Sequence, residues 1–333
     1  MPVHGAGLTG GHAGGPGRWW VGLDIGGTKV QGVLLDAAAV TRGAARRASV
    51  GGIDGVVESA ARTVEELCAA RGIELADLAG VGAGVPGLVE PATGIVSHAV
   101  NLGIDDDVPL GARLSARLGG VPVDVENDLN VAALGAARVL ELRGDLAYLA
   151  LGTGVAAGLV LDGRLRRGRF GAAGEIGHLP YVPDGAPCPC GQRGCLELYA
   201  SGSALDAAWP SRGRPSPVEV FDAAAAGDPT AVAVRDRFVD AVAAAVRLLV
   251  LTCDPEHVLL GGGVSGVGTP LLDAVVGTVA AEADRSPFLR RLRVADRLAL
   301  VPAGALVAPI GAALTVREGG PVRDTTEAVA WRS

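Results

Sequence analysis

The stretch WVGLDIGGTKVQGVLLD, residues 20–36, places two short apolar runs on either side of a Gly-Gly-Thr turn. Runs of this length joined by a glycine turn are typical of a β-hairpin, and we expect a positive φ at the glycines. LAYLALGTGVAAGLVLDG, residues 146–163, repeats this layout, with Gly152-Thr153 at the place of Gly27-Thr28. The repeat predicts a fold with two related halves.

Helical and extended patterns alternate along the rest of the chain. Helical spacing of apolar residues occurs over residues 55–71, 129–141 and 231–253, and short apolar strands over 80–85, 121–125 and 257–260. PGLVEPATG, residues 86–94, is interpreted as a turn-rich loop because of its Pro and Gly content. This alternation favours an α/β fold.

Chain length and net charge limit the number of domains and the kinds of partner that we expect. A chain of 333 residues exceeds the usual size of one domain. The net charge of −7 and the absence of a basic run predict no nucleic-acid partner and no attraction to anionic membranes. No window of about 18 apolar residues is free of charge or glycine, so no membrane span is expected. Residues 1–17 are expected to be a disordered tail, and 318–333 a loosely ordered one.

Three of the five cysteines lie within eight positions of HLPYVPDGAPCPCGQRGC, residues 178–195. The thiols of Cys188, Cys190 and Cys195, together with the imidazole of His178, form a tetrahedral donor set that favours Zn²⁺. With four protein ligands such a zinc would be structural. The alternative is a loop of surface thiols without metal.

The remaining cysteines, Cys68 and Cys253, fall in helical patterns and are interpreted as core residues. An odd number of cysteines, three of them clustered, does not suit a disulfide scaffold. We therefore expect a reducing compartment, the cytoplasm.

Three glycine turns follow apolar strands. In LDIGGTK the backbone N–H groups, the Thr28 hydroxyl and Lys29, which is the only lysine, all suit phosphate oxygens. The motif is neither a Walker A loop nor G-x-G-x-x-G, and a plain hairpin turn is the alternative. Similar turns at residues 152–154 and 261–263 indicate that three turns surround a nucleotide. Asp24, beside the first turn, could hold Mg²⁺ through water.

Two sets of polar residues are candidates for substrate chemistry. Asn127 and Asp128 end a strand and open a helix, where they are either helix caps or a base, Asp128, with Asn127 orienting the hydroxyl that it deprotonates. Glu175, His178 and Glu197 bracket the cysteine loop. They either line a site for a neutral polyhydroxylated ligand or are solvated side chains.

Six motifs in collinear order, LDIGGTK, ENDLNVAALG, LGTG, GEIGH, CPCGQRGCLE and LLGGGVS, resemble the ROK family (repressor, open reading frame, kinase) over about residues 20–315. The resemblance implies a two-domain actin/hexokinase-like (ribonuclease H-like) α/β fold with an interdomain cleft. Residues 18–128 would form the smaller domain, completed by a helix near 305–317. Residues 129–304 would form the larger domain with the zinc-binding loop.

The resemblance also implies ATP-dependent phosphorylation of a hexose, first of all glucose, at the 6-hydroxyl, with Mg²⁺. Asp128 would be the general base, and the sugar would contact Gly87, Asn127, Asp128, Glu175, His178 and Glu197. ATP and its metal would contact Asp24, Gly26, Gly27, Thr28, Lys29, Gly152, Thr153, Gly154, Gly262 and Gly263. Homodimers or homotetramers are implied as well.

Two alternatives stay open: a kinase of N-acetylmannosamine or another amino sugar, and a sugar-responsive transcriptional regulator. Regulators of the family carry a winged helix-turn-helix, for which the roughly 20 residues before the first hairpin leave no room. The sequence does not distinguish ATP from polyphosphate as the phosphoryl donor.

The chain departs from the family pattern at two places. Ala156 and Ala157 stand where relatives commonly have glycine, and if either position requires a positive φ the alanine costs about 1 kcal/mol and weakens ATP binding. NLGIDDDVPL, residues 101–110, lacks the tryptophan that often follows Asn-Leu, which leaves the sugar preference open.

Overall fold

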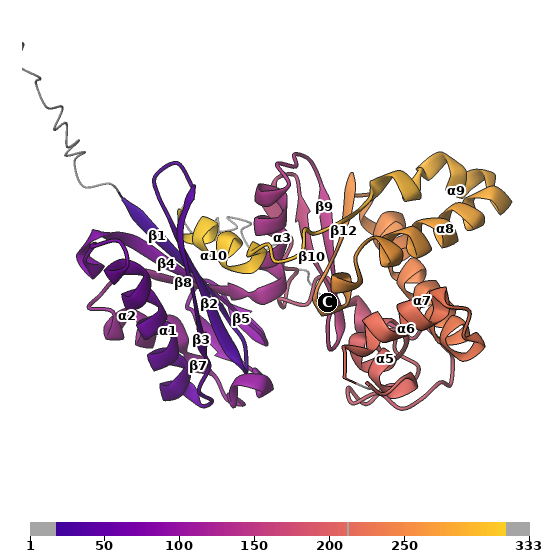
Figure 1. Ribbon diagram of the computed structural model, residues 1–333. Coiled ribbons are helices and arrows are strands. Elements are labelled where there is room, and N and C mark those ends of the chain that lie inside the picture. The colour runs from indigo at the N-terminus through magenta and orange to yellow at the C-terminus, as the bar shows by residue number, and fades with distance from the viewer. Residues whose placement is uncertain (1–17, 212, 318–333) are drawn as a thin grey trace, which may run out of the picture.

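The computed structural model describes residues 18–211 and 213–317 as two halves, each built on a five-stranded sheet (Figure 1). The tails expected at residues 1–17 and 318–333 lie outside the described residues. Helices α3 (Asp128–Val139) and α10 (Val307–Arg317) lie between the two sheets, and the other long helices lie on the outer sides.

The first sheet has the strand order β3-β2-β1-β4-β8. Its strands are β1 (Trp19–Ile25), β2 (Lys29–Leu35), β3 (Thr41–Ala48), β4 (Leu78–Val85) and β8 (Val123–Asn127). The first three form an antiparallel meander, and β4 and β8 add to β1 in parallel. The predicted first hairpin is therefore confirmed, and the strand expected over 121–125 lies two residues later.

The second sheet repeats this arrangement in the order β11-β10-β9-β12-β13. Its strands are β9 (Leu146–Leu151), β10 (Val155–Leu161), β11 (Arg164–Leu165), β12 (His257–Gly261) and β13 (Leu298–Leu300). Again the first three are antiparallel, and the last two add in parallel. The internal repeat predicted from the two hairpins is thus present in the topology.

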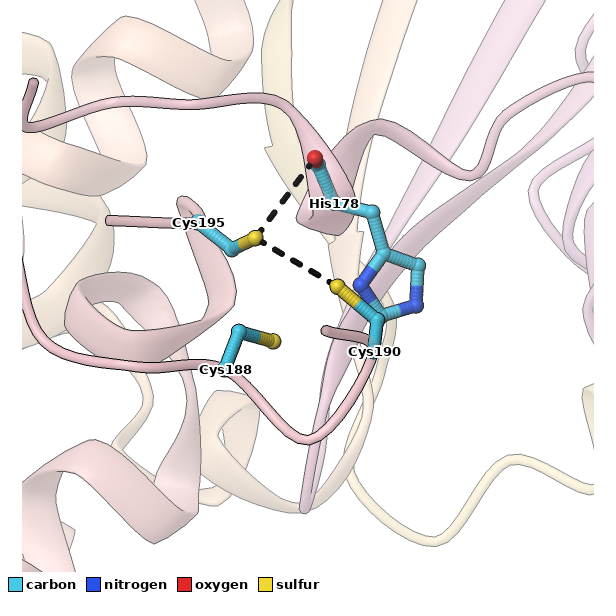
Figure 2. Close-up of side chains that lie close together, drawn as sticks. All are labelled: His178, Cys188, Cys190 and Cys195. Carbon is cyan, nitrogen blue, oxygen red and sulfur yellow. Dashed lines mark hydrogen bonds between the residues drawn. The ribbon is translucent and has the colours of Figure 1, made fainter. Parts of the chain in front are cut away.

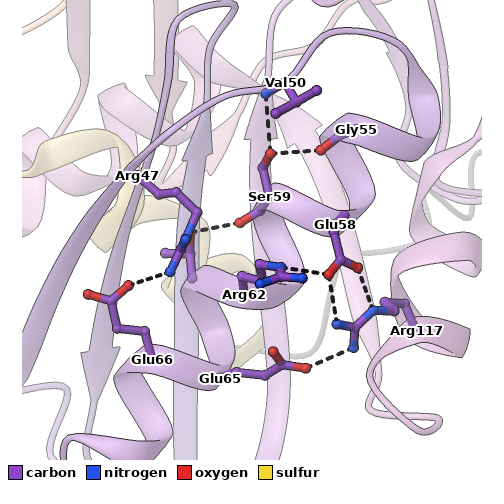
Figure 3. Close-up of polar contacts among 10 residues, drawn as sticks. Arg47, Val50, Gly55, Glu58, Ser59, Arg62, Glu65, Glu66 and Arg117 are labelled. Carbon is purple, nitrogen blue, oxygen red and sulfur yellow. Dashed lines mark hydrogen bonds and ion pairs between the residues drawn. The ribbon is translucent and has the colours of Figure 1, made fainter.

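Helices α1 (Ile53–Ala69) and α2 (Leu110–Arg117) cover the outer face of the first sheet. α1 has an apolar stripe at helical spacing that is buried in the core of this half, and Cys68 lies in it, where burial raises the pKa of its thiol to about 11. On the outer side Arg117 binds Glu58 and Glu65 and so links the two helices (Figure 3). These pairs are exposed, so each contributes at most about 1 kcal/mol.

Helices α3 and α10 connect the halves. α3 follows the first sheet, but Ala132, Ala133 and Ala136 pack in one cluster with strand β9 of the second. α10 follows the second sheet and packs against Trp20 of the first. At their crossing a Cβ on Gly135 or on Gly311 would overlap a backbone carbonyl of the other helix, which requires glycine at both positions.

The second half holds the longest helix, α7 (Pro229–Cys253), in a mainly aliphatic core. Asp228 caps its first turn by accepting from the N–H groups of Thr230 and Ala231, with Pro229 as the first helical residue. The helix ends at Asp254 in the left-handed conformation. Its neighbours are α4 (Glu197–Ala200), α5 (Gly202–Ala208), α6 (Ser216–Ala225) and α8 (Thr269–Arg285), and α9 (Pro287–Leu292) packs against α8.

The segment expected to be a turn-rich loop contains a strand, so that prediction is wrong for residues 88–90. β5 (Leu88–Glu90) pairs with β6 (Ile95–Ser97), and β6 with β7 (Val108–Pro109). The domain boundaries expected near 128 and 304 stay a prediction. No helix in the described ranges combines the length and apolar character that crossing a bilayer requires.

Candidate functional site

The carboxyl ends of the parallel strands bring the predicted polar residues together. In the first sheet Asp24 lies opposite Gly84, and Val85 lies opposite Asn127, so Asp24 and Asn127 share one edge. In the second sheet Ala150 lies opposite Gly261, so the turns after β9 and β12 also share an edge. Ligands of open α/β sheets bind at such edges.

The start of helix α3 lies against the second sheet, because Leu129, next to Asp128, packs in one cluster with Tyr148. This residue belongs to β9 of the second sheet, and burial, followed by the negative charges of Asp24 and Asp128 of the first half, raises its pKa to about 12. The Gly262 N–H donates to its hydroxyl. The glycine turn at Gly262 and the carboxylates of Asp24 and Asp128 therefore belong to one site.

Asp128 opens helix α3, but the capping role belongs to its neighbour. Asn127 Oδ1 accepts from the N–H groups of Leu129, at 2.9 Å, and Asn130, at 3.4 Å, while its Nδ2 donates to Gly87 O at 3.3 Å. Asp128 Oδ1 accepts from the Leu129 N–H at 2.9 Å, and the backbone N–H of Asp128 also bonds to this carboxyl. The carboxylate therefore keeps lone pairs for a ligand.

Burial raises the pKa of Asp128 to about 6, and the negative charges of Asp24 and Glu175 add to this rise. Burial also raises the pKa of Asp24, and the positive charge of Lys29 opposes that shift. A carboxyl that titrates near neutral pH beside a ligand site suits a general base.

The expectation of positive φ at the first turn is wrong, since neither Gly26 nor Gly27 takes one. The turn closes by a hydrogen bond from Gly26 N to Lys29 O at 2.9 Å, and Gly27 is required because a Cβ there would overlap the backbone of Asn101. Gly262 differs, with φ 82° and the backbone of Leu151 within 2.8 Å of where its Cβ would lie.

The expected strain at Ala156 and Ala157 is absent. Both residues lie in β10, opposite Ala150 and Leu149, and neither has a positive φ. Ala157 N donates to Gly174 O at 2.8 Å. The two departures from the family pattern are therefore compatible with an unstrained second hairpin.

The predicted metal ligands meet at one point (Figure 2). The ligand atoms of His178, Cys188, Cys190 and Cys195 all lie within 4.8 Å of one another. The Sγ atoms of Cys190 and Cys195 are 3.7 Å apart, close to the roughly 3.8 Å edge of a tetrahedron with Zn–S bonds of about 2.3 Å.

An orphaned imidazole nitrogen supports this site. His178 Nδ1 is buried and has no hydrogen-bond partner among the described residues, which is costly unless an ion occupies its lone pair. The Gln192 N–H lowers the pKa of Cys190 to about 6, whereas burial raises that of Cys195 to about 12. The donor set and the geometry fit Zn²⁺.

Tight turns form the cysteine loop. Cys188 N donates to Gln192 O at 2.8 Å, and Gln192 Nε2 reaches back to His178 O at 3.1 Å. Gly191 and Gly194 take φ values of 90° and 67°, and a Cβ on Gly194 would overlap Val182 O. The Pro- and Gly-rich sequence thus folds the thiols toward the histidine.

Glu197 and Glu175 flank this loop as expected. Glu197 starts α4 two residues after Cys195, and its Oε2 accepts from Val155 N at 3.1 Å beside Gly154. Glu175 precedes the short turn Ile176–His178 and lies near enough to raise the pKa of Asp128. The structure brings Glu175 to the base and Glu197 to the second glycine turn, and their sugar contacts stay a prediction.

Sequence reasoning missed Arg167 and the role of Glu126. Glu126 is 3% exposed, and its Oε2 pairs with Arg167 Nε at 2.6 Å. A cavity of about 360 Å³ lies against this pair and extends to Gly87 and Asn127. A charged residue inside a strand was a signal for Glu126, but nothing distinguished Arg167 among the neighbouring arginines.

Known proteins resemble the chain closely. The model of the ROK family matches residues 20–308. Glucokinase of Halalkalibacterium halodurans is 35% identical over 283 residues, 78% of this chain and 84% of that protein. N-acetyl-D-glucosamine kinase of Pasteurella multocida is 35% identical over 238 residues, 65% of this chain and 76% of that protein.

Among solved structures, a ROK family glucokinase from Streptomyces griseus, in complex with glucose and AMPPNP, superimposes with a TM-score of 0.71. It is 30% identical, and the match covers 90% of this chain and all of that one. The similarity confirms the α/β, two-domain actin/hexokinase-like fold that the sequence predicted.

Proposed function

The chain belongs to the ROK family, and from this premise we propose that it is a sugar kinase. It transfers the γ-phosphoryl group of ATP to the 6-hydroxyl of a hexose, with glucose as the first candidate. The observation that carries the proposal is the position of Asp128, a carboxyl with a pKa of about 6 where the edges of both sheets meet.

Asp128 is the general base. Its carboxylate accepts the proton of the sugar 6-hydroxyl while the hydroxyl oxygen bonds to the γ-phosphorus and the bond from that phosphorus to the β–γ bridging oxygen breaks. The products are a sugar 6-phosphate and ADP. A positioned base of this kind contributes about 10² to 10⁴-fold to the rate.

The glycine turns hold the triphosphate. Backbone N–H groups of the turns at residues 26–28, 152–154 and 261–263 donate to phosphate oxygens, and Lys29 adds one positive charge. Asp24 would hold Mg²⁺ near the phosphates, and the ion would neutralise part of their charge during transfer. Gly262 admits the close backbone geometry that this contact needs.

The cysteine loop holds the sugar side. With Nδ1 directed to the thiolates, His178 presents Nε2 to a sugar hydroxyl, and Glu175 and Glu197 accept from others. Asn127, fixed by its bond to Gly87 O, orients the hydroxyl at Asp128. Structural Zn²⁺ in this loop supplies conformational order, not a reacting group.

An amino-sugar kinase is the second candidate, because an N-acetyl-D-glucosamine kinase is as similar per residue as the glucokinase, over a shorter span. N-acetylmannosamine is another amino sugar to include. The ratio of kcat/KM for glucose to kcat/KM for each N-acetylhexosamine decides between the two candidates, since only the pocket around carbon 2 differs.

A coupled ADP-release assay over a panel of hexoses and N-acetylhexosamines tests the function, with zinc-replete protein and with polyphosphate as an alternative donor. Turnover of glucose with ATP is expected. No turnover of any sugar in the panel would reject the proposal.

We keep the cytoplasm as the proposed location, which the five free cysteines support. The homodimer or homotetramer expected from the family stays a prediction. Gel filtration with light scattering measures it.

A further inference from the structure

Glu126 is a buried carboxylate two residues before the proposed base, and its side chain accepts hydrogen bonds from both halves of the molecule. Its Oε1 accepts from Asn127 N at 3.0 Å and from Asn130 Nδ2 at 2.8 Å, and its Oε2 accepts from Arg167 Nε at 2.6 Å. A charge that is 3% exposed needs such partners. The start of helix α3 is thereby tied to an arginine of the second half.

Arg167 begins a closed loop that ends at Glu175. The Ala173 N–H donates to Arg167 O at 3.1 Å, and Gly174 O accepts from Ala157 N in β10 at 2.8 Å. A Cβ on Gly174 would overlap Ala157 O, so this end of the loop lies directly on the strand. The residue that follows is Glu175, whose charge reaches Asp128.

These contacts cross the two halves, from Glu126, which bonds to the backbone beside Asp128, through Arg167 to the loop that ends at Glu175. We propose that the Glu126–Arg167 pair positions the base Asp128 relative to the sugar-binding carboxylate Glu175. The inference rests on the proposed function. Neither member of the pair touches the reacting atoms, so both are positioning residues.

A purely stabilising role predicts different behaviour. Removing one partner of a buried pair leaves an unpaired charge, whereas replacing both partners by uncharged groups is often tolerated. If the pair only stabilised the fold, the double replacement would restore both thermal stability and turnover. If the pair positions the base, the double replacement restores stability alone.

The experiment compares four proteins: the wild type, Glu126→Gln, Arg167→Met and the double variant. Gln keeps an acceptor for Asn127 N and Asn130 Nδ2, and Met keeps most of the volume of the arginine stem. Tm, kcat, KM for glucose and ATP, and the calorimetric Kd of glucose are measured on each.

Both single variants are expected to melt at a lower temperature and to lose about 10 to 100-fold in kcat, the effect of misplacing a reacting group by about 1 Å. In the double variant Tm recovers toward the wild-type value while kcat stays at least about tenfold low. KM for ATP should change little throughout, because neither Glu126 nor Arg167 belongs to one of the glycine turns proposed to hold the triphosphate. If a single variant does not fold, the double variant still gives the deciding comparison.

Arg297→Met is the matched control. Arg297 is a part-buried arginine whose Nη1 pairs with Asp254 at 2.6 Å. Asp254 lies just before the start of β12, so the pair is at the end of that strand opposite the glycine turn. Its kcat should equal that of the wild type even if Tm falls.

Wild-type kcat in the double variant would overturn the inference and leave the function intact, and so would single variants that change Tm alone. Absence of hexose turnover in the wild type would instead overturn the proposed function, and the inference with it.

Discussion

The two halves of the molecule share one strand order but carry different chemistry at corresponding edges. The first edge presents carboxylates, Asp24 and Asp128, whose pKa values burial raises. The second edge presents backbone, at the turns after β9 and β12, and beside it lies the loop in which His178 and three cysteines converge. A repeated fold therefore supplies two edges, and the local sequence places buried carboxylates at the first and a glycine turn with the cysteine loop beside it at the second.

The segments inserted between the core strands also differ between the two halves. Between β4 and β8 the first half adds a small sheet and helix α2, beside which Gly87 meets Asn127. Between β11 and α7 the second half adds the cysteine loop, which directs His178 and Glu197. If the proposed roles hold, replacing the base of the first edge should lower kcat, whereas replacing a cysteine of the loop or the glycine of the turn after β12 should weaken binding of one ligand.

Removing the base should have the largest effect. Asp128→Asn is expected to lower kcat by about 10² to 10⁴-fold, because an amide cannot accept the hydroxyl proton. Glucose affinity should stay measurable by calorimetry, because Asn keeps the hydrogen bond from Leu129 N. Asp54→Asn is the control, because the Asp54 side chain is exposed on helix α1, and this variant should be as active as the wild type.

Stability gives Asp128→Asn a second readout. A folded-state pKa of about 6, above the ordinary value of 3.8, means that Asp128 stabilises the fold when neutral and that this contribution is lost as pH rises through about 6. The variant should therefore melt at or above the wild-type Tm at pH 7.5. Retained turnover would remove Asp128 from its proposed role.

The sequence predicted the parts that depend on local patterns. Both hairpins, the long helix α7 and the convergence of His178 with three cysteines follow from apolar periodicity, glycine turns and thiol spacing. These features are local, so one segment contains the information that determines each.

Features that depend on contacts between distant segments were not predicted. Gly27 was assigned a positive φ, whereas its actual constraint is the backbone of Asn101, which no pattern near residue 27 reveals. The Glu126–Arg167 pair joins residues 41 positions apart for the same reason. β5 was missed because three residues between Pro and Gly carry too short a pattern.

Loss of the metal cluster should weaken sugar binding and leave ATP binding nearly unchanged. Cys190→Ser is expected to lose zinc by elemental analysis and to raise KM for glucose by about 10 to 100-fold, while KM for ATP changes little. The physical reason is that His178 and Glu197 lose their fixed positions, whereas the first glycine turn closes through its own hydrogen bond from Gly26 N to Lys29 O.

Cys253→Ser is the matched control, because Cys253 lies at the end of α7 and outside the cluster. It should keep both zinc and KM. Less than half a zinc per chain in the wild-type protein would contradict the interpretation of the four-residue cluster.

The pH dependence distinguishes proton transfer from sugar binding in the unmodified protein. Because the base must be ionised, log kcat/KM should rise by about one per pH unit up to an apparent pKa of about 6 and then level off. Glucose Kd, measured over the same range, should change less, since binding does not require proton transfer. A flat kcat/KM profile between pH 5 and 7 would contradict the assignment of Asp128 as the base.

The smallest effect should come from the glycine turn of β12. Gly262→Ala forces a side chain into φ 82° with Leu151 backbone atoms at 2.6 to 2.8 Å, which costs about 1 to 2 kcal/mol. The strain should displace the N–H groups that we propose to bind ATP. KM for ATP should rise several-fold with KM for glucose unchanged. Gly266→Ala, where nothing lies within 4 Å of the added Cβ, should keep both values. Equal KM for ATP in the two variants would mean that the turn after β12 does not bind the nucleotide, and its proposed role at the second edge would be wrong.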